Sequence, residues 1–210
     1  MRFFDIGYIS FADALALQEW LAAEIAAGET AETVLLLEHP EIYTSGRGGA
    51  ADNVKDAAIN VIYTNRGGDV TWHGPGQLVA YPLLDLTRRG NDLHRLLRFH
   101  EEVVIALLAD YGVRSYRVKE RTGVWTDAGK IASIGIGVRR WVTMHGTALN
   151  VSCATDAFDR INPCGIARCP VTTLEREVGA SVPFSEVKAR YRQNFRSLLQ
   201  DWSPGTRPLS

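Results

Sequence analysis

Apolar residues recur at helical spacing in three segments of the chain, and capping residues mark where these segments begin and end. In the first segment, Ser10 is a favourable N-cap, Asp13 is an acidic residue in the first turn, and Gly28 follows the last apolar position. The second segment follows Asn91 or Asp92. This spacing predicts three amphipathic helices, over residues 10–28, 91–112 and 185–202.

Shorter apolar runs, bounded by glycine, proline or polar residues, predict β-strands. The run at 33–38 ends before Pro40, and we expect a polar loop at 41–49. Pro82 lies within another run and indicates an edge strand or a bulge, because proline cannot donate a hydrogen bond to a neighbouring strand. The predicted strands are 33–38, 60–64, 78–84, 124–126, 130–138 and 141–151, with a short hairpin turn at 127–129.

Strands mixed with a few packed helices predict an α+β fold, with a single domain over residues 1–210. A formal net charge of −1 gives no overall basic field of the kind that nucleic-acid binders carry. The apolar runs are far shorter than the ~18 residues of a membrane span, and the N-terminal residues lack the apolar region of a signal peptide. Three cysteines, an odd number, argue against a disulfide framework. We therefore expect a reduced, cytoplasmic protein that binds neither nucleic acid nor membrane.

The segment Arg66–Gln77 is rich in glycine and contains a proline, so it is a poor candidate for a helix or a strand interior. Glycine lets a backbone approach a ligand closely. One interpretation is a tight connection between two strands. The other is the wall of a binding pocket, with Arg66 and His73 as its polar groups. The segment fits neither of the glycine-rich phosphate-binding motifs.

Cys164 is a candidate nucleophile because it lies between Pro163 and Gly165, which fix a loop and leave the sulfur uncrowded. A free cysteine is also often a small buried hydrophobic residue, and we expect this of Cys153 and Cys169. The cysteines form no CxxC pair and no histidines have ligand spacing, so we predict no metal site.

Lys130 opens an apolar, glycine-punctuated strand, where its ammonium would be partly desolvated. A thiol of ordinary pKa (~8.5) is only a few per cent ionised at neutral pH. A lysine in a dry site beside Cys164 would make the thiolate the dominant form. The alternative is that Lys130 extends to solvent at the end of a hairpin. His73 and His145 are the other candidate bases, or are hydrogen-bonded structural residues.

Five motifs follow one another along the chain: Glu38-His39-Pro40, Arg66–Gln77, Lys130 with Ser133-Ile134-Gly135, His145–Asn150 and Ile161–Gly165. In this order they resemble the motifs of the lipoate-protein octanoyltransferase family. In Arg66–Gln77 the one departure is Trp72, where the family more commonly has tyrosine, and this should alter the width of the pocket. The two highly specific motifs are Arg66–Gln77 and Asn162–Gly165.

The resemblance implies an α+β fold shared with biotin and lipoate ligases, and an acyltransferase of lipoate biosynthesis and protein lipoylation. Cys164 would take an octanoyl group from octanoyl-acyl carrier protein as a thioester, forming an acyl-enzyme intermediate. Lys130 would favour the thiolate and later help to move protons. The acceptor would be a lysine on a lipoyl domain of a 2-oxoacid dehydrogenase complex or on the glycine-cleavage H protein. Because the thioester arrives activated, the resemblance implies no ATP and no other cofactor.

The resemblance also implies an acyl pocket, with His145 as a possible support. Glycine N–H groups there could face the thioester oxygen as oxyanion donors. The expected pocket residues are Arg66, Gly67, Gly68, Asp69, Val70, Thr71, Trp72, His73, Ser133, Ile134, Gly135, Gly146, Thr147 and Ala148.

Acyl carrier proteins are acidic, so we expect a basic docking face on this chain. Two groups of basic residues are candidates, and each could instead be an ordinary solvated surface. The first group is Arg88, Arg89, Arg95 and Arg98, and the second is Arg114, Arg117, Lys119 and Arg121.

Three other functions are compatible with parts of this pattern. An ATP-dependent lipoate or biotin ligase of the same fold would need no nucleophilic cysteine, so Cys164 argues against it. A cysteine hydrolase or thioesterase would use Cys164 with His73 or His145 and would release the acyl group to water. A non-enzymatic acyl- or protein-binding module would keep the pocket but not the reactive pair of Cys164 and Lys130.

Overall fold

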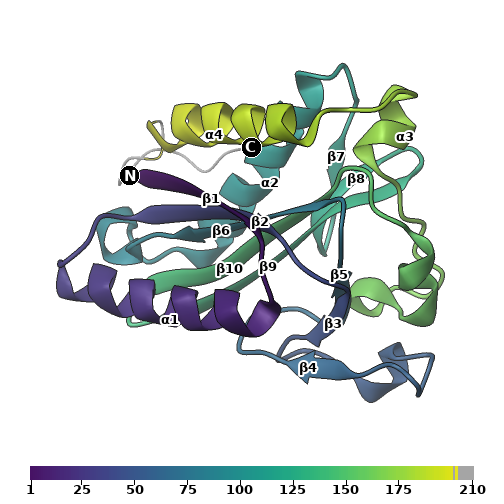
Figure 1. Ribbon diagram of the computed structural model, residues 1–210, viewed down its shortest axis with the longest axis horizontal. Helices are drawn as coiled ribbons and strands as arrows, with labels where there is room; N and C mark the ends of the chain where they lie inside the picture. Colours follow the sequence, from purple (N-terminus) through teal and green to yellow (C-terminus); the bar gives the residue numbers. More distant parts are fainter. Residues whose placement is uncertain (201, 203–210) are drawn as a thin grey trace.

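The computed structural model describes residues 1–200 and 202. A seven-stranded mixed sheet forms its centre, and helices cover both faces (Figure 1). In spatial order the strands are β1 (Arg2–Tyr8), β2 (Thr33–Glu38), β6 (Gln77–Leu83), β10 (Val142–Asn150), β9 (Gly129–Arg139), β8 (Arg121–Thr126) and β7 (Tyr116–Val118).

Two long helices pack together over one face of this sheet, and a third covers the other face (Figure 1). Helices α2 (Leu93–Ala109) and α4 (Phe184–Gln200) form the pair, and α1 (Phe11–Ala27) lies on the opposite side against β6 and β10. A short helix, α3 (Leu174–Val178), precedes α4. This arrangement confirms the predicted α+β class.

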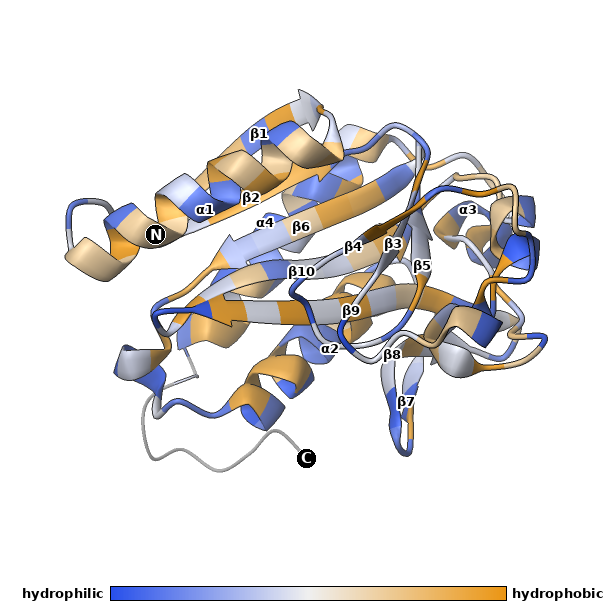
Figure 2. Cartoon of the chain, turned by 90° about the horizontal axis from the view of Figure 1, so that it is seen from below, coloured by the Kyte–Doolittle hydropathy of each residue, from blue (hydrophilic) through white to orange (hydrophobic). Residues whose placement is uncertain are grey.

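Central strands such as β2 are continuously apolar because both of their faces are buried. In β2, Val34 and Leu36 join the core under α2 and α4, whereas Leu35 and Leu37 join the core under α1. Alternate residues of a strand point to opposite faces, so a sheet covered on both sides needs continuous apolar runs. Figure 2 shows such apolar residues along much of β6 and β9.

The three predicted helices are confirmed, with their local signals. The Ser10 hydroxyl accepts the N–H of Asp13 at 3.1 Å, and Gly28 ends α1 with φ of +81°. Asp92, and not Asn91, caps α2 by accepting the N–H of Arg95 at 2.9 Å. The described part of α4 ends at Gln200; positions 201 and 203–210 of the predicted domain lie outside the described residues.

Pro82 was expected at an edge or a bulge, and the edge is wrong, because β6 lies between β2 and β10 in the sheet. The regular pairing of β6 with β10 ends at Ala80 and Thr147. Beyond it the Pro82 ring faces Gly146, where an added Cβ would lie 2.8 Å from the proline Cδ. The regular pairing of β10 with β6 therefore stops before the position at which proline cannot donate a hydrogen bond.

A second, three-stranded sheet corrects two sequence-based expectations. Strand β3 (Ile42–Ser45) lies between β4 (Val61–Tyr63) and β5 (Thr71–His73). The predicted loop at 41–49 therefore contains a strand, and so does the glycine-rich segment 66–77. Their polar and glycine-rich neighbours hid both strands, which form through pairing with each other rather than through local propensity.

None of the helices within residues 1–200 and 202 combines the length and the apolar character needed to cross a membrane.

Candidate active site

Cys164 is presented by a tight turn, Pro163–Gly165, at the end of a loop. Its backbone is in the left-handed region, with φ of +56° and ψ of +31°, which costs a non-glycine residue about 1–2 kcal/mol. The N–H of Gly165 donates to the carbonyl of Asn162 at 3.0 Å and closes the turn. Strained residues of this kind cluster at functional sites.

Lys130 directly contacts this sulfur. Its Nζ lies 2.7 Å from Cys164 Sγ, and the side chain is only 2% exposed. The Lys130 backbone is held from the other side, since its N–H donates to Pro170 and its carbonyl accepts from Thr172. The alternative in which Lys130 extends to solvent is therefore wrong.

The Lys130 ammonium is an unusual buried cation. Within residues 1–200 and 202, no carboxylate lies within ion-pair distance of it, and its Nζ stands 5.2 Å from the centre of the Trp125 ring. A buried charge without a counter-ion costs several kcal/mol. A Cys164 thiolate would supply the missing negative charge.

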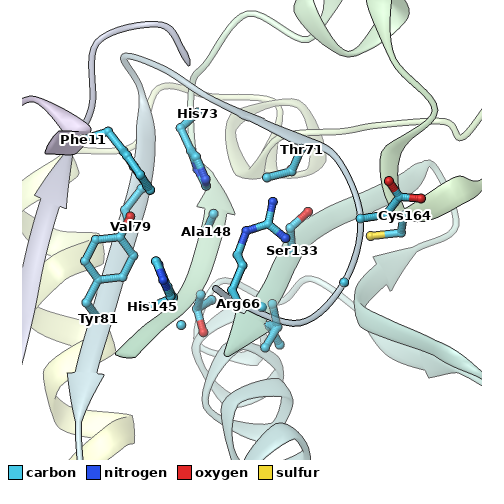
Figure 3. A pocket seen from close by; sticks show the side chains of 16 residues that line it. Phe11, Arg66, Thr71, His73, Val79, Tyr81, Ser133, His145, Ala148 and Cys164 are labelled. Carbon is cyan, nitrogen blue, oxygen red and sulfur yellow. The ribbon is translucent and has the colours of Figure 1, made fainter. Parts of the chain in front are cut away.

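A pocket leads inward from Cys164, between the two sheets and the N-terminal end of α1. Figure 3 shows its residues: Phe11 and Tyr81 lie toward one end, Cys164 lies at the other, and Arg66 extends into the middle. The lining residues are Phe11, Arg66, Gly68, Asp69, Thr71, His73, Val79, Tyr81, Ser133, Ile134, Gly135, His145, Gly146, Thr147, Ala148 and Cys164.

Arg66 fills the centre of this pocket. Its guanidinium donates to the carbonyl and the hydroxyl of Thr44, at 2.8 and 3.0 Å, and to the carbonyl of Gly67 at 3.1 Å. Burial lowers the pKa of Arg66. The remaining free space is about 40 Å³, which is smaller than an eight-carbon chain. Side chains of the pocket must therefore move before such a chain can enter.

Two buried histidines line the pocket and are held by amide side chains. His73 Nδ1 lies 2.8 Å from Gln77 Oε1, and His145 Nε2 lies 2.8 Å from Asn65 Oδ1. Burial, followed by neighbouring charges, lowers the pKa of His73 to about 3 and that of His145 to about 4. Both rings are therefore neutral at pH 7.

Neither imidazole has the geometry of a base for Cys164. In the described chain no hydrogen bond joins His73 or His145 to the sulfur, and strongly lowered pKa values make them weak bases. The interpretation of both as hydrogen-bonded structural residues is supported. Behind them, His39 bonds to the Tyr81 hydroxyl at 2.8 Å.

Most of the expected pocket residues lie together, and three do not line the inner pocket. Gly67 lies outside it, and its N–H already donates to the carbonyl of Ile136 at 2.8 Å, so this N–H is not available as an oxyanion donor. Val70 and Trp72 face a separate apolar cluster, where the Trp72 ring packs against Phe158.

Sequence reasoning missed several residues that line or support the pocket. Phe11 lies near the N-terminal end of α1 and was expected only as part of a helix start. Val79 and Tyr81 are alternate residues of β6 on the face toward α1. Strand alternation could have grouped these two, but nothing local in the sequence brings Phe11 to them.

The other two cysteines differ in burial. Cys153 is 5% exposed, as expected, and burial raises the pKa of its thiol to about 12. Cys169 is only half-buried, so the expectation of a fully buried side chain is wrong for it.

Acidic partners already occupy much of the first predicted basic group. Arg89 pairs with Glu32 at 2.7 Å, and both side chains are about nine-tenths buried. Arg98 pairs with Glu101 at 2.7 Å. In the second group, Arg117 pairs with the same Glu101 at 3.1 Å. These arginines already form ion pairs within the chain, which makes them weaker candidates for docking an acidic partner.

Comparison with known proteins shows the family to which the chain belongs. Residues 10–196 match the family described as the lipoyl protein ligase A/B catalytic domain. The chain is 59% identical to the octanoyltransferase of Geotalea uraniireducens, over 97% of this chain and 95% of that protein. It is 43% identical to the octanoyltransferase of Rubrobacter xylanophilus, over 95% and 93%.

Solved structures of low sequence identity share the fold. A bipartite lipoate protein ligase from Thermoplasma acidophilum superposes with a TM-score of 0.68 at 18% identity, covering 98% of this chain and 86% of that one. Biotin protein ligase from Aquifex aeolicus superposes with a TM-score of 0.56 at 15% identity, covering 96% and 70%. The family match and the close relatives together show that this chain belongs to the lipoyl protein ligase A/B catalytic domain family, among its octanoyltransferases.

Proposed function

We propose that this enzyme transfers an octanoyl group in two steps through a thioester on Cys164. The donor is octanoyl-acyl carrier protein, and the acceptor is a lysine of a lipoyl domain or of the glycine-cleavage H protein. The main support for this proposal is the 2.7 Å contact between Lys130 Nζ and Cys164 Sγ, in a site where the lysine is 2% exposed.

In the first step the Cys164 thiolate attacks the thioester carbonyl of the donor. The bond between that carbonyl and the carrier sulfur breaks, and the departing thiolate takes a proton from the Lys130 ammonium. The products are an octanoyl thioester on Cys164, a free carrier thiol and a neutral Lys130 amine. Nucleophilic catalysis of this kind divides one difficult transfer into two easier ones.

In the second step the neutral amine of the acceptor lysine attacks the acyl-enzyme. Lys130 accepts the proton that the attacking nitrogen loses, and Cys164 leaves as a thiolate. An amide has formed, and the ion pair of Lys130 and Cys164 is restored. No ATP is consumed, because the donor thioester is already activated.

The inner pocket is proposed to hold the octanoyl chain, with Phe11 and Tyr81 at the end away from Cys164 and Ser133, Gly146 and Ala148 along its walls. Entry of the chain requires Arg66 to give up part of the space that it fills.

The lowered pKa values of His73 and His145 speak against the hydrolase alternative, because neither ring is a good base for water at neutral pH. The contact between Lys130 and Cys164, at the mouth of the inner pocket, speaks against the ligase alternative. An ATP-dependent ligase would need no nucleophilic cysteine there.

Initial-rate kinetics test the two-step mechanism, with both the donor and the lipoyl domain varied. A ping-pong pattern, with parallel double-reciprocal lines, is expected. Cys164→Ser should lose transfer by several orders of magnitude, whereas the matched variant Cys169→Ser should retain it. Intersecting lines, or an active Cys164→Ser, would refute the acyl-enzyme.

A further inference from the structure

A second cavity opens to Cys164 from the opposite side. It is a groove of about 590 Å³ between the N-terminal end of α2 and strand β9. The inner pocket lies on the α1 face of the sheet, whereas this groove lies on the α2 face. Both cavities are lined by the same five residues where they meet: Gly68, Asp69, Ile134, Gly135 and Cys164.

The two cavities meet because β9 is only partly covered by its neighbour. Strand β8 pairs with β9 only as far as Ala132. Farther along, the Gly67 N–H donates to the Ile136 carbonyl and covers the open edge. Between these two contacts lies Gly135, where an added Cβ would stand 3.0 Å from the Arg66 side chain and 3.2 Å from the Gly67 carbonyl. The missing side chain lets Arg66 and the Gly67 backbone lie close to β9 at this junction.

The groove has an apolar floor and a charged rim. Its floor includes Leu97, Ile136 and Val138, and the exposed Leu93 extends it outward. The rim carries the exposed guanidinium groups of Arg47 and Arg121, for which the described chain provides no ion pair, with His94 beside them and Glu120 as the acidic member.

We infer that this groove binds the phosphopantetheine arm of the donor, with Arg47 and Arg121 contacting its phosphate. The inference rests on the proposed function. The reacting sulfur has one cavity on each side, and the two halves of a thioester extend in opposite directions from the carbonyl. If the acyl chain occupies the inner pocket, the thiol half leaves through the groove.

The chemistry of the arm fits the groove. Pantetheine is a slender chain of methylene and amide groups, long enough to lie along an apolar floor, and it ends in a phosphate. Arginine is well suited to bind phosphate through charge-assisted hydrogen bonds. Once the carrier thiol has left, the groove is also the free route for the acceptor lysine.

Two small donors test the inference without the carrier protein: octanoyl-pantetheine, and octanoyl-4′-phosphopantetheine, which adds the phosphate. For the wild type, kcat/KM should be roughly tenfold higher with the phosphorylated donor, and this preference should shrink as salt rises. Arg47→Ala and Arg121→Ala should each reduce the preference. Arg2→Ala, an exposed arginine on the far edge strand β1, should leave it unchanged.

Equal kcat/KM of the wild type for the two donors would overturn the inference. A preference that survives in both groove variants would also overturn it, as would variants that raise only the KM for the lipoyl domain. These outcomes are distinct from failure of the proposed function, in which the wild type would transfer octanoyl from neither donor to the lipoyl domain.

Discussion

Replacing Lys130 by methionine removes the charge beside Cys164 and keeps most of the volume of the side chain. Lys130 is buried, its Nζ lies 2.7 Å from the sulfur, and within the described chain it has no carboxylate partner. The variant therefore separates the effect of this charge from the effect of packing. We expect Lys130→Met to fold, because the Cys164 sulfur can take up a proton when the ammonium is lost, so that no unpaired charge stays buried.

The size of the effect follows from the separation of the two charges. At 2.7 Å and an effective dielectric constant of about 20, a full ion pair gains about 6 kcal/mol, and desolvation of both groups offsets much of it. About 2 kcal/mol of net gain is enough to turn a thiol that is a few per cent ionised at pH 7 into one that is about half ionised. Loss of the charge should therefore lower the thiolate fraction by up to about 30-fold.

Two assays should respond to different extents. Alkylation of Cys164 by iodoacetamide at pH 7, followed at the Cys164 peptide by mass spectrometry, should slow by about 10- to 30-fold, as the thiolate fraction falls. Octanoyl transfer should fall further, by about 10²- to 10⁴-fold beyond this, because Lys130 is also the proposed proton carrier. Thermal unfolding and circular dichroism check that the variant is folded, and a free cysteine derivative gives the reference alkylation rate.

Equal alkylation rates for the folded variant and the wild type would refute the role of the lysine charge. Equal losses in alkylation and transfer would support the role of the lysine charge and refute the role of Lys130 as proton carrier.

Three further predictions follow from other parts of the site. The unfolded chain protonates histidine at its ordinary pKa of 6.5, whereas burial lowers the pKa of His73 and His100 to about 3 and that of His145 to about 4. The unfolded state therefore binds more protons below pH 6.5, and urea unfolding should show a loss of about 2 kcal/mol per histidine between pH 7 and pH 5; an unchanged midpoint would contradict this. Phe11→Ala should lengthen the inner pocket at the end away from Cys164 and raise kcat/KM for decanoyl relative to octanoyl donors, and an unchanged ratio would exclude Phe11 as a determinant of chain length. Gly146→Ala should destabilise the fold by more than about 2 kcal/mol in thermal or urea unfolding, because Gly146 has φ of +157° and a Cβ there would lie 2.4 Å from the Ala80 carbonyl; near wild-type stability would count against this.

Local signals in the sequence were enough to predict the helices. The caps at Ser10 and Gly28 act within one turn of the helix end, so the residues themselves carry the information. The position of Cys164 in a tight turn was also predictable from local signals, because the proline and the glycine that shape the turn are adjacent to it. These features need no knowledge of distant segments.

Long-range pairing decided what the sequence could not show. Strand β5 forms inside a glycine-rich segment because β3 offers it a partner, and Pro82 is tolerated inside the sheet because β10 deviates beside it. The contact of Lys130 with Cys164 joins residues 34 positions apart, and the family resemblance implied it, whereas neither local pattern did. Phe11 reaches the pocket through the packing of α1, which no motif reports.

Intact-protein mass spectrometry can detect the octanoyl thioester that we propose on Cys164. The wild type and Cys164→Ser are incubated with octanoyl-acyl carrier protein without ATP, and a lipoyl domain is then added. The proposal predicts a single hydroxylamine-sensitive octanoyl adduct on the wild type, absent from the variant and passed on to the lipoyl domain. An adduct that decays without labelling the lipoyl domain would indicate a thioesterase. Labelling that requires free octanoic acid and ATP, with no adduct on Cys164, would contradict the mechanism.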